Sequence, residues 1–99
     1  MLEALYGGAI EDAAERQRSL PTAQLEAQAL SAPPALNALE WLAPSERIKV
    51  IAEVKRASPS RGDLSAIPDP AHLASIYAEN GASAISVLTE QRKFKGSLA

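Results

Sequence analysis

The sequence contains no cysteine, few aromatic residues and almost no net charge. Without cysteine the chain cannot form disulfide bonds, thiolate zinc sites or a cysteine nucleophile, which agrees with a reducing compartment. The formal charge of −2 provides no overall attraction to nucleic acid or to an anionic membrane. These absences leave a globular chain whose fold rests on packing, with neither a nucleic-acid nor a membrane partner expected.

Long apolar segments and cofactor motifs are also missing. The longest stretch without a charged residue, 27–39, is interrupted by Pro33 and Pro34 and falls short of the about 20 apolar residues that cross a membrane. The first residues lack the basic start of a secretory signal, which favours the cytoplasm. No glycine-rich phosphate motif and no G-x-S-x-G motif occurs, so the sequence indicates no cofactor and no metal.

Residues 1–47 carry helical patterns. Apolar residues recur at three- and four-residue steps over 2–13, which predicts an amphipathic helix. A second, shorter pattern lies between Pro21 and Pro33, and a third covers 36–42. Because these patterns contain no polar constellation, we expect the helices to be structural; the alternative is a lid over a site.

The apolar period changes to two after this helical part. Residues 48–54 alternate and are rich in β-branched side chains, which predicts a strand, and the turn-forming residues of 57–68 end it. Asp69 can cap a following helix that stops at Gly81, and 84–88 read as a second strand. A polar loop is expected after that strand.

Strand, helix and strand in this order form a βαβ unit, which predicts parallel strands and an α/β fold. Two parallel strands with one crossover helix leave both edges of the sheet open and cannot cover both of its faces. We therefore expect the chain to be part of a larger α/β sheet.

Two charged side chains lie at the end of the first predicted strand. Glu53 and Lys55 are two residues apart, so they share one face of the strand, at the carboxyl end where ligands gather in parallel sheets. The pair can serve as a general acid or as an anion clamp, or it can be an ordinary surface ion pair. The apolar row from Ile48 to Val54 should pack on helices, which would turn the pair inward and favours function.

Other polar residues carry less information. Ser58 begins a loop with hydroxyls, a cation and a glycine, a composition that suits anion binding and equally suits a plain turn. The basic residues Arg92, Lys93 and Lys95 are expected to be solvated. His72 has no second ligand at metal spacing and is expected to be a surface imidazole, while Trp41, among leucines, is expected to pack.

The run Val50–Ser60, with Leu64 four residues on, resembles the first-strand signature of the indole-3-glycerol phosphate synthase family. The resemblance continues through Ile85–Glu90 and Phe94–Ser97, and extends weakly back to the N-terminal helix. It implies a TIM (β/α)8 barrel. Residues 1–47 would then be an N-terminal helical extension packing on the barrel, and residues 48–99 its first βαβ unit and the loop that follows.

The same resemblance implies a carbon–carbon lyase, a carboxy-lyase of tryptophan biosynthesis that needs no cofactor or metal. Its reaction converts 1-(2-carboxyphenylamino)-1-deoxyribulose 5-phosphate to indole-3-glycerol phosphate with loss of carbon dioxide and water. By motif, Glu53 matches an active-site glutamate and Lys55 a substrate-contacting lysine and candidate proton donor. Ser58 matches a serine beside the substrate, and Phe94 an aromatic residue near the anthranilate ring.

A (β/α)8 barrel takes about 250 residues, so this chain would supply two of the eight strands. We therefore expect the 99-residue piece to be inactive by itself. Beyond the phosphorylated substrate, the expected partners are other enzymes of the tryptophan pathway. The alternative is a noncatalytic α/β module that binds an anionic metabolite or partner at the same strand end. Another phosphate-binding barrel enzyme is disfavoured by the spacing of Glu53, Lys55, Ser58 and Pro59.

Overall fold

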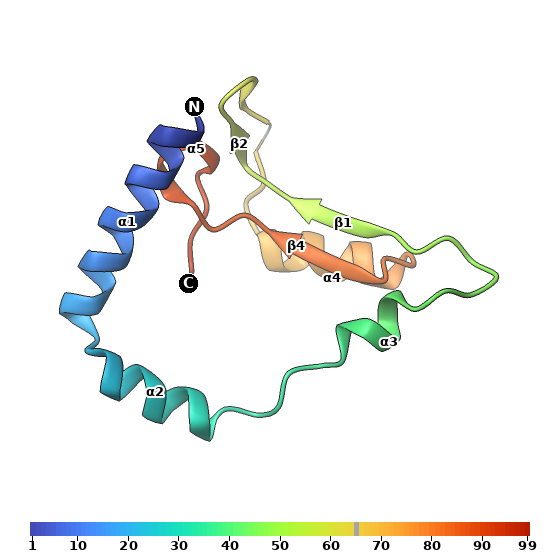
Figure 1. The fold of residues 1–99 in the computed structure, drawn as a ribbon. Helices are drawn as coiled ribbons and strands as arrows, with labels where there is room; N and C mark the ends of the chain where they lie inside the picture. The colour runs from blue at the N-terminus through green and yellow to red at the C-terminus, as the bar shows by residue number, and fades with distance from the viewer. Residues whose placement is uncertain (65) are drawn as a thin grey trace. The chain divides into compact units, whose positions relative to one another are not determined.

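Figure 1 shows a computed structural model of the chain, which describes residues 1–64 and 66–99. The chain forms two compact units, Met1–Leu36 and Asn37–Ala99. No helix in these described ranges is long and apolar enough to cross a membrane.

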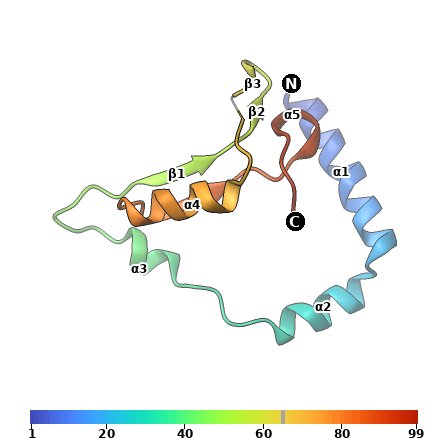
Figure 2. The same cartoon turned by 180° about the vertical axis from the view of Figure 1, so that it is seen from behind.

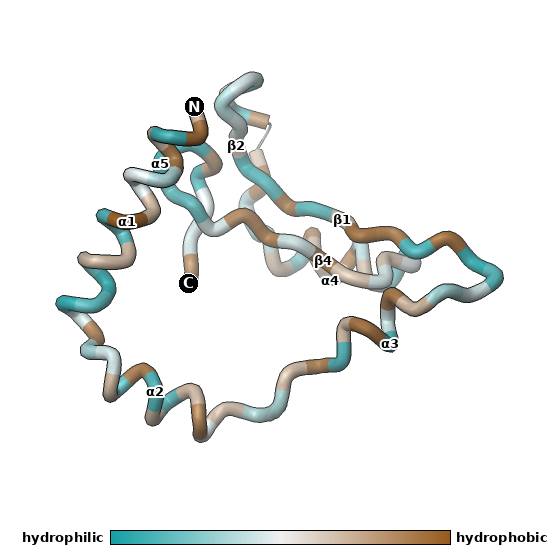
Figure 3. Tube along the Cα trace, viewed as in Figure 1, coloured by the Kyte–Doolittle hydropathy of each residue, from teal (hydrophilic) through white to brown (hydrophobic). Residues whose placement is uncertain are grey.

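The first unit consists of two helices, α1 (Leu2–Ser19) and α2 (Thr22–Ser31). Both were predicted from the apolar pattern, and α1 continues through its internal glycines. Apolar residues recur along both helices (Figure 3), yet Gly8 is the one buried residue among those described in them. Leu30 is 89% exposed, so the apolar stripes of this unit remain in contact with solvent.

The second unit is built on a βαβ element, as predicted. β1 (Ile51–Val54) and β4 (Ala84–Val87) pair in parallel, with Ile51 opposite Ala84 and Val54 opposite Val87. α4 (Pro70–Glu79) contacts both strands (Figure 2). The chain therefore has the α/β character that its period change indicates.

β1 is shorter than predicted, because its pairing begins at Ile51 rather than at Ile48. The backbone carbonyl of Val50 accepts from the N–H groups of Ser83 and Ala84, at 2.8 and 3.4 Å, where the chain leaves the turn after α4. Ile48 has no residue of β4 opposite it and is 91% exposed. The prediction that the whole apolar row packs on a helix is therefore wrong for Ile48.

The ends of α4 follow the predicted signals. The Asp69 carboxylate accepts from the backbone N–H of His72 at 3.0 Å, and proline occupies the first turn. The helix ends at Glu79 and is followed by Asn80 as its C-terminal cap. Gly81 then adopts φ +101°, a left-handed conformation that glycine reaches without steric cost.

A small antiparallel hairpin occupies part of the segment that we expected to be an irregular turn. It pairs β2 (Ala57–Ser58) with β3 (Gly62–Asp63), and Gly62 turns the chain with φ +64°. At its base the Arg56 guanidinium donates to the carbonyl oxygen of Ile67, at 3.3 and 3.0 Å. The hairpin is thus tied to the segment that leads into α4.

Two short helices complete this unit. α3 (Ala38–Leu42) is capped by Asn37, whose side chain accepts from the backbone N–H groups of Leu39 and Glu40, and the helix contacts β4. α5 (Gln91–Phe94) lies where a polar loop was predicted. Its formation is explained by the Glu90 side chain, which accepts hydrogen bonds from the first free N–H groups of the helix.

The core of the second unit is small and lies around the carboxyl end of β1. Val54 is 2% exposed, Ala57 3% and Ser58 7%. Because successive side chains of a strand point to opposite faces, the burial of Val54 assigns Glu53 and Lys55 to the other face.

Candidate active site

Glu53 and Lys55 form an ion pair at the carboxyl end of β1. Lys55 Nζ lies 3.9 Å from Glu53 Oε1, and both side chains are slightly less than half exposed. From the neighbouring strand, Ser86 Oγ donates to Glu53 Oε2 at 3.4 Å. The carboxylate is therefore held from both sides, by the lysine that follows it and by the residue opposite it in the sheet.

The hydrogen bond from Ser86 to Glu53 was not predicted from the sequence. The second strand was predicted, but the residue opposite Glu53 depends on the register between the two strands. The signal that could have found it is the alternation of 84–88, which places one polar residue, Ser86, between apolar neighbours.

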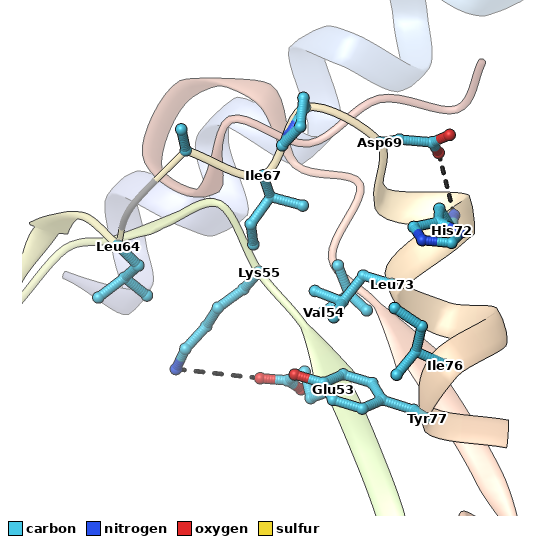
Figure 4. A pocket seen from close by; sticks show the side chains of 12 residues that line it. Glu53, Val54, Lys55, Leu64, Ile67, Asp69, His72, Leu73, Ile76 and Tyr77 are labelled. Carbon is cyan, nitrogen blue, oxygen red and sulfur yellow. Dashed lines mark hydrogen bonds and ion pairs between the residues drawn. The ribbon is translucent and has the colours of Figure 1, made fainter. Parts of the chain in front are cut away.

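A groove of about 580 Å³ borders the ion pair (Figure 4). Glu53 and Lys55 supply a charged rim on one side, and Asp69 and His72 supply polar groups at the start of α4. The remaining lining is mostly apolar and comes from β1, the segment before α4 and α4 itself: Val54, Leu64, Ala66, Ile67, Pro68, Leu73, Ile76 and Tyr77. The groove thus joins an ion pair to an apolar wall.

Ser58 is buried in the β2–β3 hairpin. Its Oγ accepts from the backbone N–H of Arg61 at 3.2 Å and lies 3.4 Å from the Oγ of Ser60. The Ser58 carbonyl also accepts from the same Arg61 N–H, at 3.3 Å. The serine therefore shapes the turn of the hairpin, and it retains a hydroxyl that can act as a donor.

Phe94 ends α5 and is half-buried. Its backbone N–H donates to Glu90 Oε2 at 3.2 Å, and α5 contacts β2. The structure thus brings the elements that carry Ser58 and Phe94 together, although the two residues lie far apart in the sequence.

Glu90 has an altered pKa. Desolvation raises the pKa of its carboxyl, but the backbone N–H groups of Lys93, Arg92 and Phe94 and the charge of Arg92 together outweigh it, so the pKa of Glu90 lies below its ordinary value. The carboxylate is therefore the favoured state, and as an anion it caps the positive end of α5.

The basic residues after β4, Arg92, Lys93 and Lys95, are exposed, as expected, but Lys95 is also engaged in a contact. Lys95 forms an ion pair with Asp63, the last residue of β3. The side chain of His72 is exposed, as predicted, and its backbone N–H serves the cap of α4. Trp41 is 58% exposed, so the prediction that it packs among leucines is wrong within the described residues.

Chemically, the arrangement combines a cation, a carboxylate and hydroxyl donors at the carboxyl end of a parallel strand. An ammonium group at this position can bind an anion or donate a proton to a developing alkoxide.

Comparison with known proteins places these residues in a family context. Residues 2–99 match the family model described as indole-3-glycerol phosphate synthase. A protein of that name from Leifsonia xyli subsp. xyli is 62% identical over 99 residues, which cover 100% of this chain and 38% of that protein. Proteins of the same name from Arthrobacter sp. and Rhodococcus opacus are 50% and 52% identical, each over 100% of this chain, and over 38% and 36% of their own length. The chain thus spans less than two fifths of these relatives.

Proposed function

This chain belongs to the indole-3-glycerol phosphate synthase family, and on that premise we propose that its residues serve the ring-closure reaction of that enzyme. The reaction converts 1-(2-carboxyphenylamino)-1-deoxyribulose 5-phosphate to indole-3-glycerol phosphate and releases carbon dioxide and water. The observation that supports the proposal most directly is the Glu53–Lys55 pair at the carboxyl end of β1, on the face opposite the buried Val54.

The proposed architecture is a TIM (β/α)8 barrel, in which β1 and β4 are the first two strands and α4 the crossover helix. In such a barrel the helices lie outside, so side chains on the face of β1 opposite α4 look into the barrel. Residues 1–47 are proposed as the N-terminal helical extension that packs on it, and 48–99 as its first βαβ unit with the following loop.

The proposed chemistry begins with attack of the anthranilate ring carbon on the ribulose carbonyl. The ammonium of Lys55 binds the anionic substrate and is a candidate donor of the proton that the developing alkoxide needs. Glu53 holds that ammonium at the end of β1 through their ion pair. Carbon dioxide then leaves, and the elimination of water requires an acid and a base.

Ser58 and Phe94 are proposed as substrate-binding residues. The hydroxyl of Ser58 is a donor beside the substrate, and the ring of Phe94 packs near the anthranilate ring. The proposed substrate is thus a phosphorylated small molecule, and the enzyme acts in the cytoplasm, with other tryptophan-pathway enzymes as its proposed protein partners.

The experiment uses this chain extended to the length of its relatives, with ring closure followed by the formation of the indole product. Lys55→Ala should lower turnover by at least about 100-fold, the contribution of one positioned acid, and leave the folded structure intact. Lys49→Ala is the matched control, because Lys49 is exposed and precedes the opposite end of β1. It should leave turnover unchanged.

Two results would contradict this proposal. Full turnover by Lys55→Ala would show that Lys55 does not take part in the reaction. No product from the unsubstituted long chain, together with binding of an anionic metabolite at the strand end, would favour the noncatalytic α/β module. The 99-residue chain by itself should give no product, and turnover by a polypeptide verified to end at Ala99 would contradict that expectation.

A further inference from the structure

An ion pair joins the two segments that follow the parallel strands. Asp63 ends the β2–β3 hairpin after β1, and Lys95 directly follows α5 after β4; the two residues are 32 positions apart in the sequence. Their side chains are 68% and 58% exposed. A contact of this kind closes a long loop, whereas the Glu15–Arg18 pair lies within one helix and closes none.

Both partners are attached to backbone of defined conformation. Asp63 pairs with Ala57 in the hairpin, next to the left-handed Gly62. Lys95 itself has φ +52°, and the following Gly96 donates its N–H to the carbonyl of Glu90 at 2.8 Å. The ion pair therefore connects two turns whose backbone conformations are each fixed by local hydrogen bonds and dihedral angles.

The same two turns carry the proposed substrate-binding residues. In the hairpin, Ser58 pairs with Gly62, the residue that directly precedes Asp63. Phe94 is the residue that directly precedes Lys95. Movement of either turn relative to the other would change the separation of the Ser58 hydroxyl and the Phe94 ring.

We propose that Asp63 and Lys95 are positioning residues, whose ion pair sets the placement of Ser58 relative to Phe94 for substrate binding. The inference rests on the proposed function, because it needs Ser58 and Phe94 to contact the substrate. Neither Asp63 nor Lys95 touches the reacting atoms in this scheme. Their effect is expected in KM rather than in kcat, since the binding contacts that they place are made before and during the reaction.

Kinetics of the chain extended to its relatives' length provide the first test. Asp63→Asn and Lys95→Gln should each raise KM about two- to five-fold with little change in kcat, the size expected for one exposed ion pair. The double variant should be no worse than either single variant, and the exchange of Asp63→Lys with Lys95→Asp should restore at least about half of the lost kcat/KM. Glu15→Gln, which breaks the pair within α1, is the matched control and should leave both constants unchanged.

Two kinetic results would overturn the inference. One is a double variant whose loss equals the product of the two single losses. The other is an exchanged pair that stays as slow as the single variants. A variant that merely disturbs folding would not raise KM alone, and exchanging the two charges would not restore its kcat/KM.

Proteolysis tests the link independently of turnover. Arg61 is exposed between β2 and β3, so an arginine-specific protease can cut the Arg61–Gly62 bond when the hairpin opens. Cleavage should be about two- to five-fold faster in Asp63→Asn and in Lys95→Gln, and should return to the original rate in the exchanged pair.

The two tests separate the inference from the proposed function. No product from the unsubstituted long chain would overturn the function, while the cleavage rates would still decide whether the link exists. Unchanged cleavage in both single variants would overturn the link. Faster cleavage with an unchanged KM would show a link that positions nothing, and would overturn the inference as well.

Discussion

The helices of the two units begin in different ways. α1 and α2 have no side chain that caps their first N–H groups, whereas α3, α4 and α5 are each capped by a side chain, of Asn37, Asp69 and Glu90. Caps satisfy backbone donors that a helix cannot satisfy itself. The start of each helix in the second unit is therefore specified by one residue, while the helices of the first unit depend on their length and their apolar stripes.

Burial differs in the same direction. Val54 gives the second unit a fully enclosed large side chain, and in the first unit the one buried position among the described residues is a glycine. In residues 37–99, helix caps and side-chain burial thus stabilise the same structure. The helices of residues 1–36 have neither, so their stability depends on the burial of their apolar stripes.

The largest effect is expected at Val54. Val54→Ala should lower the free energy of unfolding by about 2 to 3 kcal/mol, because two buried carbons are lost and a cavity remains. Ile10→Ala in α1 should change it by no more than about 0.5 kcal/mol, since Ile10 is more than half exposed. Urea unfolding followed by circular dichroism measures both, and equal effects would refute the contrast between the units.

Glycine substitutions should have opposite signs in the two units. A Cβ at Gly96 would overlap the backbone carbonyl oxygen of Leu88, so Gly96→Ala should cost about 1 to 3 kcal/mol of folding free energy. A Cβ at Gly7 meets nothing within 4 Å, and Gly7→Ala should stabilise α1 by about 1 kcal/mol. Thermal unfolding of the two variants measures whether each substitution stabilises or destabilises the chain. A more stable Gly96→Ala variant would show that the backbone of this turn can shift to make room for the Cβ.

Loss of a cap should have a moderate effect. Asp69→Ala removes the acceptor of the His72 N–H and should destabilise the second unit by about 1 kcal/mol. Asp69→Asn keeps an acceptor oxygen and should recover most of that loss. Amide hydrogen exchange in the first turn of α4 measures the effect; exchange in Asp69→Ala equal to that of the unsubstituted chain would mean that the cap contributes nothing.

The smallest effect is expected from acid. Because the folded state lowers the pKa of Glu90, its contribution to stability is present above the unfolded value of about 4.5 and is lost as pH falls through the folded pKa. Exchange of the Lys93 and Phe94 amides should therefore gain an extra acid dependence below about pH 4.5, which Glu90→Gln removes. The first turn of α2, which contains no acidic residue, should show no such step.

Sequence reasoning succeeds where the signal is local. α4 is bounded by Asp69, Pro70 and Gly81, and each residue acts on the backbone next to it, so the helix was predictable without knowledge of its neighbours. The approach of Glu53 and Lys55 follows in the same way from the period of a strand. The roles assigned to these residues came from the family resemblance and not from their spacing.

The features that were missed depend on contacts between distant segments or on unusual caps. The β2–β3 hairpin requires the positive φ of Gly62 in a segment whose composition indicates only turns. α5 requires a glutamate as its cap, a residue type outside the usual set. The Ser86 contact requires the register of two strands, and the Lys95 ion pair requires two turns to meet.

Trp41 gives the second unit a built-in optical reporter. It is the single tryptophan of the chain, it is 58% exposed, and its helix, α3, contacts β4. Indole emission shifts to shorter wavelength when the ring leaves water. Its fluorescence therefore follows, without any label, whatever comes to cover that side of the βαβ element.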